Sequence, residues 1–214
     1  MENEKLTICN AFNQPIGHAE RSEVHKNGLW HRSVNYLVLD KEKRTLVFQD
    51  SQTLDQFDKD KFFIKMNGGH VQSGDMESEM ARELHEELGL EIAQAKDTHF
   101  LGVYQVSFEP TEDFINREFM YFYLVSFKNT FRNIGMDENE VKTVLEIPVD
   151  DTVDLLVGDR AEIEVAAKDI NNTEMKLTLT SQAFKNFTDD ALYLRLFLAA
   201  QDSCNGRDTK HIVI

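Results

Sequence analysis

Apolar and polar residues alternate over several stretches of the chain, as they do in strands that bury one face. Residues 30–39 place Val34, Tyr36 and Val38 on one side, and residues 45–49 follow a DKEKR turn, so we expect a β-hairpin there. Aromatic and β-branched residues favour a second strand pair. The remaining strand candidates are residues 5–9, 99–108, 114–127, 141–149, 162–167 and 175–179, the last two joined around Asn171-Asn172.

Apolar residues at spacings of three and four predict helices. The clearest pattern begins near Asp75 and ends at Gly89, and residues 19–27 and 150–156 predict shorter helices. Turn chemistry marks residues 13–17, and a polar run marks a loop at 50–61. A helical pattern also runs over residues 181–201, through Phe184, Phe187, Ala191, Leu194 and Leu198. We expect an α/β (α+β) fold, an α/β/α sandwich whose mixed sheet has the central helix on one face and the C-terminal helix on the other.

The central helix is divided into an acidic and an apolar face. Its acidic arc, about 100° wide, holds Glu79, Glu83, Glu86 and Glu87, and the apolar stripe beside it holds Met80, Ala81, Leu84 and Leu88. Like charges on adjacent turns repel, and a bound divalent cation removes that conflict. Carboxylate oxygens suit hard ions such as Mg²⁺. A solvated acidic face is the ordinary alternative.

The residues around this acidic face favour the metal interpretation. Arg82 precedes Glu86 by four residues, where it can fix a carboxylate by a charge-assisted bond. Gly68-Gly69 allow close approach of a backbone to phosphate or metal, and Gly74-Asp75 supply a turn and a helix N-cap. Gly89 then fits the left-handed position that ends a helix.

Composition narrows the class of protein. A chain of 214 residues is long enough for one sizeable core. Its formal charge of −15 disfavours a nucleic-acid polymer as partner. Cys9 and Cys204 show no metal-ligand spacing, and no apolar run approaches the roughly 18 residues that span a bilayer. We therefore expect a cytoplasmic protein that does not act at a membrane. A small anionic substrate is compatible with this charge only if bound metal and local cations receive it.

The run from Arg82 to Leu90 fits Arg-Glu-apolar-x-Glu-Glu-x-Gly-apolar, and so resembles the second half of the Nudix box. Within that superfamily the chain is similar to the branch that holds isopentenyl-diphosphate isomerases and isomerase-like hydrolases. The residues that carry this likeness are Gly28-Leu29-Trp30-His31-Arg32, Gly69-His70 and Asn116-Arg117-Glu118. The resemblance implies one Nudix domain over residues 1–214, with an N-terminal strand extension (1–28) and a C-terminal hairpin and helix elaboration (158–214).

The resemblance implies hydrolysis rather than isomerisation. Isomerases of this type use a cysteine just before the Gly-His pair, where this chain has Gly68, and they tend to carry a degraded box. The hydrolases bind Mg²⁺ or Mn²⁺ and activate a water that attacks a phosphoanhydride. By this likeness Glu86 and Glu87 are metal ligands, Glu83 is a ligand or base, the Gly69 carbonyl is a further ligand, and Glu118 is an outside candidate for base or ligand.

Two features depart from the family pattern. The first departure is the spacing of the box. If the box begins at Gly69, the segment before Arg82 is one residue shorter than in the family pattern. If it begins at Gly68, the family spacing is kept, but Gly74 stands where the pattern has an acidic residue. His31 and His70 match positions where the isomerases hold a second metal, with His25 close to a third and Asn116 in place of a ligand carboxylate. The ordinary alternative for each histidine is a surface or hydrogen-bonded role.

The expected substrate is a nucleoside diphosphate derivative. Arg32 and Lys65 are candidate phosphate contacts, with Arg117 as another local cation. Tyr104 is a candidate for stacking on a base. The aromatic set considered with it is Phe108, Phe114 and Phe131. A non-catalytic Nudix module that binds a nucleotide or a protein is the alternative class, and edge strands of the 158–180 hairpin suggest a homodimer.

Overall fold

The computed structural model describes residues 4–50, 62–72, 75–111, 113–185 and 191–209. The first half of the chain forms β1 (Lys5–Cys9), β2 (Pro15–Glu20), α1 (Arg21–Asn27), β3 (Trp30–Asp40), β4 (Thr45–Asp50), β5 (Asn67–His70), α2 (Met76–Leu88) and the short helix η2 (Ile92–Gln94). The second half forms β6 (Asp97–Thr111), β7 (Phe114–Phe127), α3 (Thr130–Asn133), β8 (Thr143–Pro148), α4 (Val149–Val157), β9 (Glu162–Asp169), β10 (Glu174–Thr180), η3 (Ser181–Phe184) and α5 (Leu192–Cys204).

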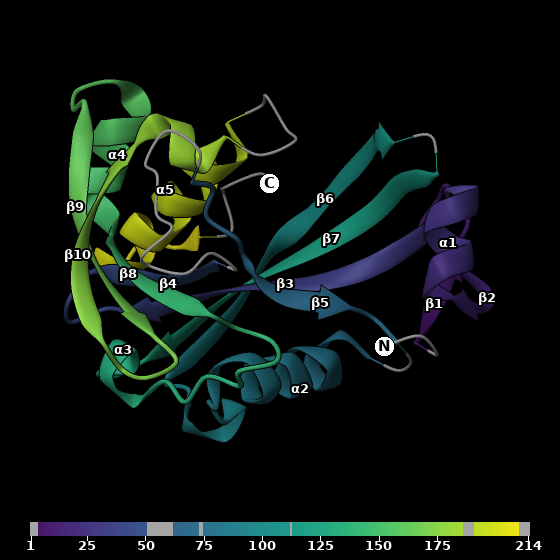
Figure 1. Ribbon diagram of the computed structural model, residues 1–214, viewed down its shortest axis with the longest axis horizontal. Helices are drawn as coiled ribbons and strands as arrows, with labels where there is room; N and C mark the ends of the chain where they lie inside the picture. The colour runs from purple at the N-terminus through teal and green to yellow at the C-terminus, as the bar shows by residue number, and fades with distance from the viewer. Residues whose placement is uncertain (1–3, 51–61, 73–74, 112, 186–190, 210–214) are drawn as a thin grey trace.

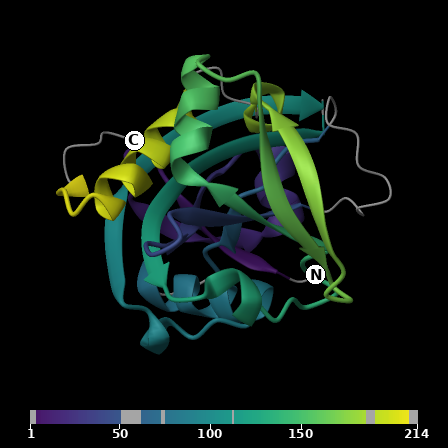
Figure 2. The ribbon, with the colours of Figure 1, turned by 90° about the vertical axis from the view of Figure 1, so that its left-hand side faces the viewer.

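Strand β3 is the centre of the sheet. One edge of β3 pairs in parallel with β7, and β7 pairs antiparallel with β6. The other edge pairs antiparallel with β1, β5 and β4 in turn, and β4 leads on to β8, β9 and β10. The sheet is therefore mixed, as predicted, although most of its pairs are antiparallel. Figure 2 shows that it is curved rather than flat.

Helices cover both faces of the sheet, which confirms the predicted layers (Figure 1). On one face, Val34, Tyr36 and Val38 of β3 pack in a core with Met80, Leu84 and Leu88 of α2. On the other face, Leu37 and Leu39 belong to a larger core that includes residues of α4 and α5. The alternation along β3 thus places neighbouring side chains in different cores.

The ends of α2 are those expected from its sequence. The Asp75 side chain accepts a hydrogen bond of 2.9 Å from the backbone N–H of Ser78, which caps the first turn. Gly89 has φ 62°, the left-handed conformation that glycine adopts most readily at a helix end. Both ends of the acidic helix are therefore fixed by local chemistry. Gly74 lies outside the described residues.

Two sequence predictions are wrong at their boundaries. Residues 15–17, predicted as part of a turn, begin strand β2, which lies at the end of the sheet; an edge strand tolerates Pro15 at its first position. Residues 181–201 do not form one helix. The chain forms η3, and α5 begins only at Leu192 after Ala191 in a left-handed conformation (φ 61°). Residues 186–190, including Phe187, lie outside the described residues. So does the predicted loop at 50–61, except for Asp50, which ends strand β4.

The buried stripe of α5 also differs from the predicted one. Leu192, Leu196 and Phe197 are buried, whereas Leu194 and Leu198 are only half-buried. Helix 19–27 begins at Arg21 but ends at Gly28 as expected. Strand β10 lies at an end of the sheet, and the homodimer expected through its hairpin stays a prediction. Among the described residues, no helix is both long enough and apolar enough to cross a membrane.

Candidate active site and metal centre

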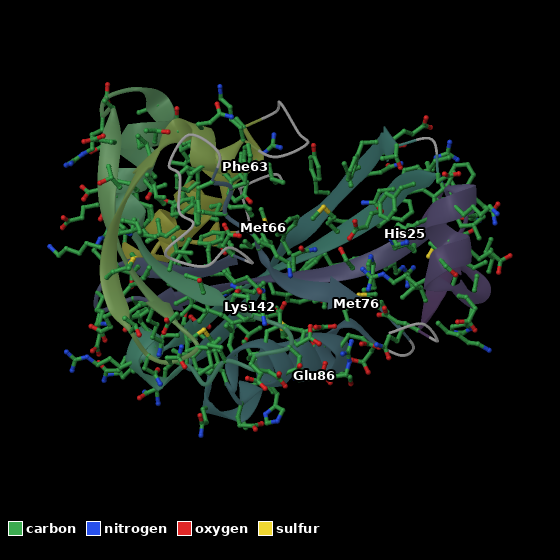
Figure 3. The ribbon with its side chains drawn as sticks, viewed as in Figure 1. His25, Phe63, Met66, Met76, Glu86 and Lys142 are labelled. Carbon is green, nitrogen blue, oxygen red and sulfur yellow. The ribbon has the colours of Figure 1, made fainter. Side chains whose placement is uncertain are left out.

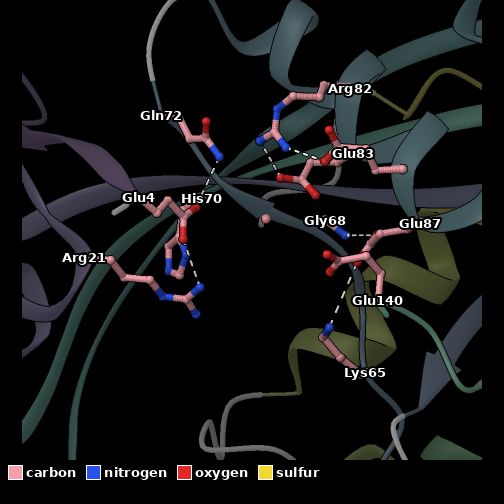
Figure 4. A pocket seen from close by; sticks show the side chains of 12 residues that line it. Glu4, Arg21, Lys65, Gly68, His70, Gln72, Arg82, Glu83, Glu87 and Glu140 are labelled. Carbon is pink, nitrogen blue, oxygen red and sulfur yellow. Dashed lines mark hydrogen bonds and ion pairs between the residues drawn. The ribbon is translucent and has the colours of Figure 1, made fainter. Parts of the chain in front are cut away.

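A cavity of about 650 Å³ lies between the acidic face of α2 and strand β5 (Figure 4). It brings together seven of the residues predicted from the sequence as site residues: Lys65, Gly69, His70, Arg82, Glu83, Glu86 and Glu87. Its other lining residues are Glu4, Arg21, Gly68, Gln72 and Glu140. The wall formed by α2 is thus acidic, while Arg21 and Lys65 bring positive charge from outside that helix.

Arg82 binds the acidic side chains of its own helix together. Its guanidinium donates hydrogen bonds of 2.6 Å to Glu83, 2.6 Å to Glu86 and 2.9 Å to Glu79. The donor fork of arginine matches carboxylate geometry, so these bonds hold the carboxylates at set positions. The charge-assisted bond that the spacing of Arg82 and Glu86 suggested is therefore present.

Gly69 faces the carboxylate of Glu83 at very short range. A Cβ atom at position 69 would lie 2.3 Å from Oε1 of Glu83, so a side chain there would displace that carboxylate from its present position. Burial raises the pKa of Glu83 to about 7, against the lowering effect of Arg82. A carboxyl group with this pKa is suited to taking up or releasing a proton near neutral pH.

Glu87 is the most enclosed of the box acids, with 3% of its surface exposed. Burial raises its pKa, and hydrogen bonds from Tyr36 and Gln49 oppose that shift. Neither donor was predicted from the sequence as a site residue. The carboxylates of Glu83, Glu86 and Glu87, with the Gly69 backbone beside them, form an all-oxygen donor set of the kind that Mg²⁺ or Mn²⁺ takes.

Four predicted site residues, His31 among them, do not line this cavity. Arg32 donates from Nε to the side-chain oxygen of Asn13 at 2.7 Å and also bonds the Asn13 carbonyl, so it holds the β1–β2 turn. Tyr104 packs against the core on the α5 side of the sheet. Glu118 lies opposite His31 in the β3–β7 register.

A second polar cluster surrounds Glu118. Ligand atoms of His25, His31 and His70 lie within 4.8 Å of one another, and Asn116 donates a hydrogen bond of 2.8 Å to Glu118. Figure 3 shows His25 near α1, well away from Glu86 on α2. His70 lines the cavity and also belongs to the cluster. The structure therefore brings His25, which the sequence placed close to a third position, together with His31 and His70.

Two of the three histidine rings are arranged for binding through Nε2. Nδ1 of His25 and Nδ1 of His31 lie 2.9 and 3.0 Å from backbone carbonyls, which only accept, so Nδ1 is the nitrogen that carries a proton in each ring. Nε2 of His31 is buried without a hydrogen-bond partner among the described residues. Burial lowers the pKa of His31, and that of His70 to about 3, so both are neutral at pH 7.

The aromatic candidates for base stacking lie elsewhere. Phe131 is buried in the core on the α2 side, and Phe114 stacks on the ring of His25 with centroids 4.4 Å apart. Phe108 packs against the core on the α5 side. None of the three lines the acidic cavity as the structure describes it.

Several lining residues carried no signal in the sequence. Glu4, Arg21 and Gln72 approach through an ion pair of 3.0 Å between Arg21 and Glu4 and a hydrogen bond from Gln72 to Glu4. Glu140 comes from the segment before β8. These residues belong to ordinary polar stretches of the sequence rather than to a motif, and only the fold brings them to the cavity.

Comparison with known proteins agrees with this geometry. The NUDIX domain family matches residues 29–168 of the chain. An uncharacterized Nudix hydrolase of Clostridium acetobutylicum is 31% identical over 153 residues, which are 71% of this chain and 73% of that protein. The chain therefore belongs to the Nudix hydrolases, a family of pyrophosphohydrolases.

Solved structures are similar at lower identity. The crystal structure of DR0079 from Deinococcus radiodurans is 21% identical, with a TM-score of 0.49 over 70% of this chain and 86% of that one. The MutT protein from Methanosarcina mazei is 18% identical, with a TM-score of 0.42 over 58% of this chain and 80% of that one. The isomerase-like branch suggested by the sequence stays a prediction.

Proposed function

We propose that the chain hydrolyses the diphosphate linkage of a nucleoside diphosphate derivative with Mg²⁺ or Mn²⁺. The observation that carries this proposal is the gathering of Glu83, Glu86 and Glu87 beside Gly69 in one cavity of about 650 Å³. A solvated acidic face would not need Glu87 at 3% exposure or glycine opposite Glu83. Both features favour a site built for a ligand.

The roles of the side chains follow from their surroundings. When bound, the divalent cation neutralises phosphate charge and lowers the pKa of a water for attack. Glu86 and Glu87 would hold it, with the Gly69 carbonyl as a further oxygen. Glu83, with its pKa near 7, would take the proton of the attacking water. Arg82 keeps Glu83 and Glu86 oriented.

Lys65 is the best placed of the predicted substrate contacts. Its ammonium lies 4.0 Å from Glu87 and its side chain is 56% exposed, so it can reach a phosphate in the cavity. Arg21 offers a second cation on the opposite wall. Because the chain carries −15 overall, these local cations and the bound metal must receive the anion. Arg32 and Tyr104 would reach a substrate only beyond this cavity.

An assay over a panel of nucleoside diphosphate derivatives tests the proposal. We expect phosphorylated products to form with Mg²⁺ or Mn²⁺ and to stop forming when EDTA is added. Thermal unfolding is followed with the same panel. Stabilisation by a nucleotide with no turnover in either metal would support the alternative, a binding module.

We also propose that the histidine cluster, His25, His31 and His70 with Glu118, is a second metal site for a transition metal such as Zn²⁺. Neutral imidazoles with Nδ1 bonded to carbonyls are the form that binds such metals, and the convergence of the three rings within 4.8 Å supports it. The ordinary alternative is a set of buried, hydrogen-bonded histidines. In that case the buried Nε2 of His31, which has no hydrogen-bond partner in the described part of the chain, stays unsatisfied.

Metal content distinguishes these alternatives. After dialysis against Zn²⁺ and buffer, we expect His70→Ala to retain one equivalent less per chain than the wild type. His99→Ala is the control, since His99 pairs with Asp97 outside the cluster. Equal zinc content in the wild type and both variants would contradict a metal site at the cluster.

A further inference from the structure

The carboxylate of Glu87 is held by donors from three strands. Its Oε2 accepts a hydrogen bond of 2.6 Å from the hydroxyl of Tyr36 and one of 2.8 Å from the backbone N–H of Gly68. Its Oε1 accepts a bond of 2.7 Å from Nε2 of Gln49. Figure 4 shows the Gly68 bond and the longer approach of Lys65. Strands β3, β4 and β5 therefore converge on one side chain of α2.

Both side-chain donors are polar groups in an apolar layer. Tyr36 is 0% exposed and Gln49 is 1% exposed. Tyr36 lies between Val34 and Val38 on the face of β3 that packs on α2, where a phenylalanine would fill the same space without a polar atom. Burying a hydroxyl or an amide costs free energy unless it is hydrogen-bonded. Core packing alone gives no reason for either group at these positions, whereas the contact with Glu87 does.

The third donor also depends on a specific backbone. Gly68 has φ 132°, and a Cβ atom there would lie 2.0 Å from the carbonyl oxygen of Val34. Only glycine lets β5 lie this close to β3 while its N–H points at Glu87. The close pairing of β5 with β3 therefore places the Gly68 N–H where it donates to the Glu87 carboxylate.

The three groups that donate hydrogen bonds to Glu87 are neutral, whereas the group that donates to Glu83 and Glu86 is cationic. Glu83 and Glu86 are bonded by the cationic Arg82, which cancels part of their negative charge. Tyr36, Gln49 and Gly68 are neutral, so they orient Glu87 and leave its negative charge in place. An ionised carboxylate has about four lone-pair sites, and these three bonds leave about one for a cation.

We propose that Tyr36 and Gln49 are positioning residues, which hold Glu87 in one orientation so that a single lone pair faces the divalent cation. This inference rests on the proposed metal role of the box acids. Partners that orient a metal ligand in this way typically change metal affinity by about 10- to 100-fold when they are removed.

Mn²⁺ binding, measured by electron paramagnetic resonance on the full chain, tests the proposal. We follow the Mn²⁺ site whose signal is lost in Glu86→Gln. This criterion separates that site from Mn²⁺ bound at the histidine cluster. We expect Tyr36→Phe and Gln49→Met each to weaken this site by about 10- to 100-fold. Tyr193→Phe is the matched control, because the Tyr193 hydroxyl is also buried but donates to the Ile64 carbonyl at 3.1 Å in the other core.

Two further measurements separate positioning from general stability. Unfolding temperature in EDTA should fall no further in Tyr36→Phe than in Tyr193→Phe. Turnover of Tyr36→Phe should be low at limiting Mn²⁺ and recover towards the wild-type value at saturating Mn²⁺. Unchanged Mn²⁺ affinity in Tyr36→Phe, with a wild-type site that Glu86→Gln does remove, would overturn the positioning role alone. A wild type with no such site would overturn the proposed function as well.

Discussion

Glutamine in place of Glu86 or Glu87 is expected to lower Mg²⁺-dependent turnover by about 10²- to 10³-fold, the usual cost of losing one electrostatic contact to a reacting centre. Each substitution keeps the size of the side chain and removes the charge that would hold the cation. The Glu86 side chain is 47% exposed, so its replacement should leave the fold unchanged. The measurement is kcat for product formation over a range of Mg²⁺ concentrations, with unfolding temperature recorded alongside.

Glu77→Gln is the matched control for these variants. Glu77 lies on the first turn of the same helix, is exposed and does not line the cavity. Glu77→Gln changes the net charge by the same amount as Glu86→Gln or Glu87→Gln, so a general effect of charge on turnover would appear in this control too. Wild-type turnover in Glu86→Gln and Glu87→Gln would contradict the metal role of the box acids.

Gly69→Ala is the second substitution expected to have a large effect. One added methyl group would lie 2.3 Å from Oε1 of Glu83, and the shift that relieves this contact must move the carboxylate or strand β5. Because small misplacements of a catalytic group cost about 10²-fold, we expect kcat to fall by at least that factor. The assay is the same nucleotide panel, supported by circular dichroism to show that the fold is kept.

Gly135→Ala controls for the substitution itself. A Cβ atom at Gly135 meets no other atom within 4 Å, so alanine should fit there without displacement. Wild-type kcat in Gly69→Ala would show that the carboxylate of Glu83 can move without loss, and would remove Glu83 from its proposed role as base.

The central helix was predictable because its signals are local. The cap at Asp75, the end at Gly89 and the division of acidic and apolar faces all depend on residues within a few turns of one another. Gly69 and Glu83, which face each other in the structure, also belong to the same sequence motif. A short stretch of sequence therefore contained most of the proposed metal site.

The donors to Glu87 were not predictable in the same way. Alternation along β3 correctly placed Tyr36 with Val34 and Val38, but periodicity shows which face a side chain takes and not which atom its hydroxyl meets. Gln49 reaches Glu87 only because β4 pairs beside β3. Contacts between residues 38 and 51 positions apart depend on the assembled sheet.

The errors at β2 and α5 have a different cause, because tertiary structure overrides local preference at both places. Pro15 and Gly17 favour a turn in isolation, yet the edge of a sheet accepts both. In the C-terminal segment, Ala191 adopts a left-handed conformation that its side chain does not favour, so the helix begins after it and the buried stripe moves to Leu192, Leu196 and Phe197. Pairing with β1 overrides local preference at β2, and burial in the larger core overrides it at α5.

The guanidinium of Arg82 has one more consequence, for the order of folding and metal loading. Because it already neutralises part of the charge on Glu79, Glu83 and Glu86, helix α2 does not depend on an external ion to hold its acids together. Small zinc domains acquire their structure only when the ion arrives. Here, by contrast, we expect maturation in two separate stages, with a chelator able to strip the ion from a polypeptide that stays folded.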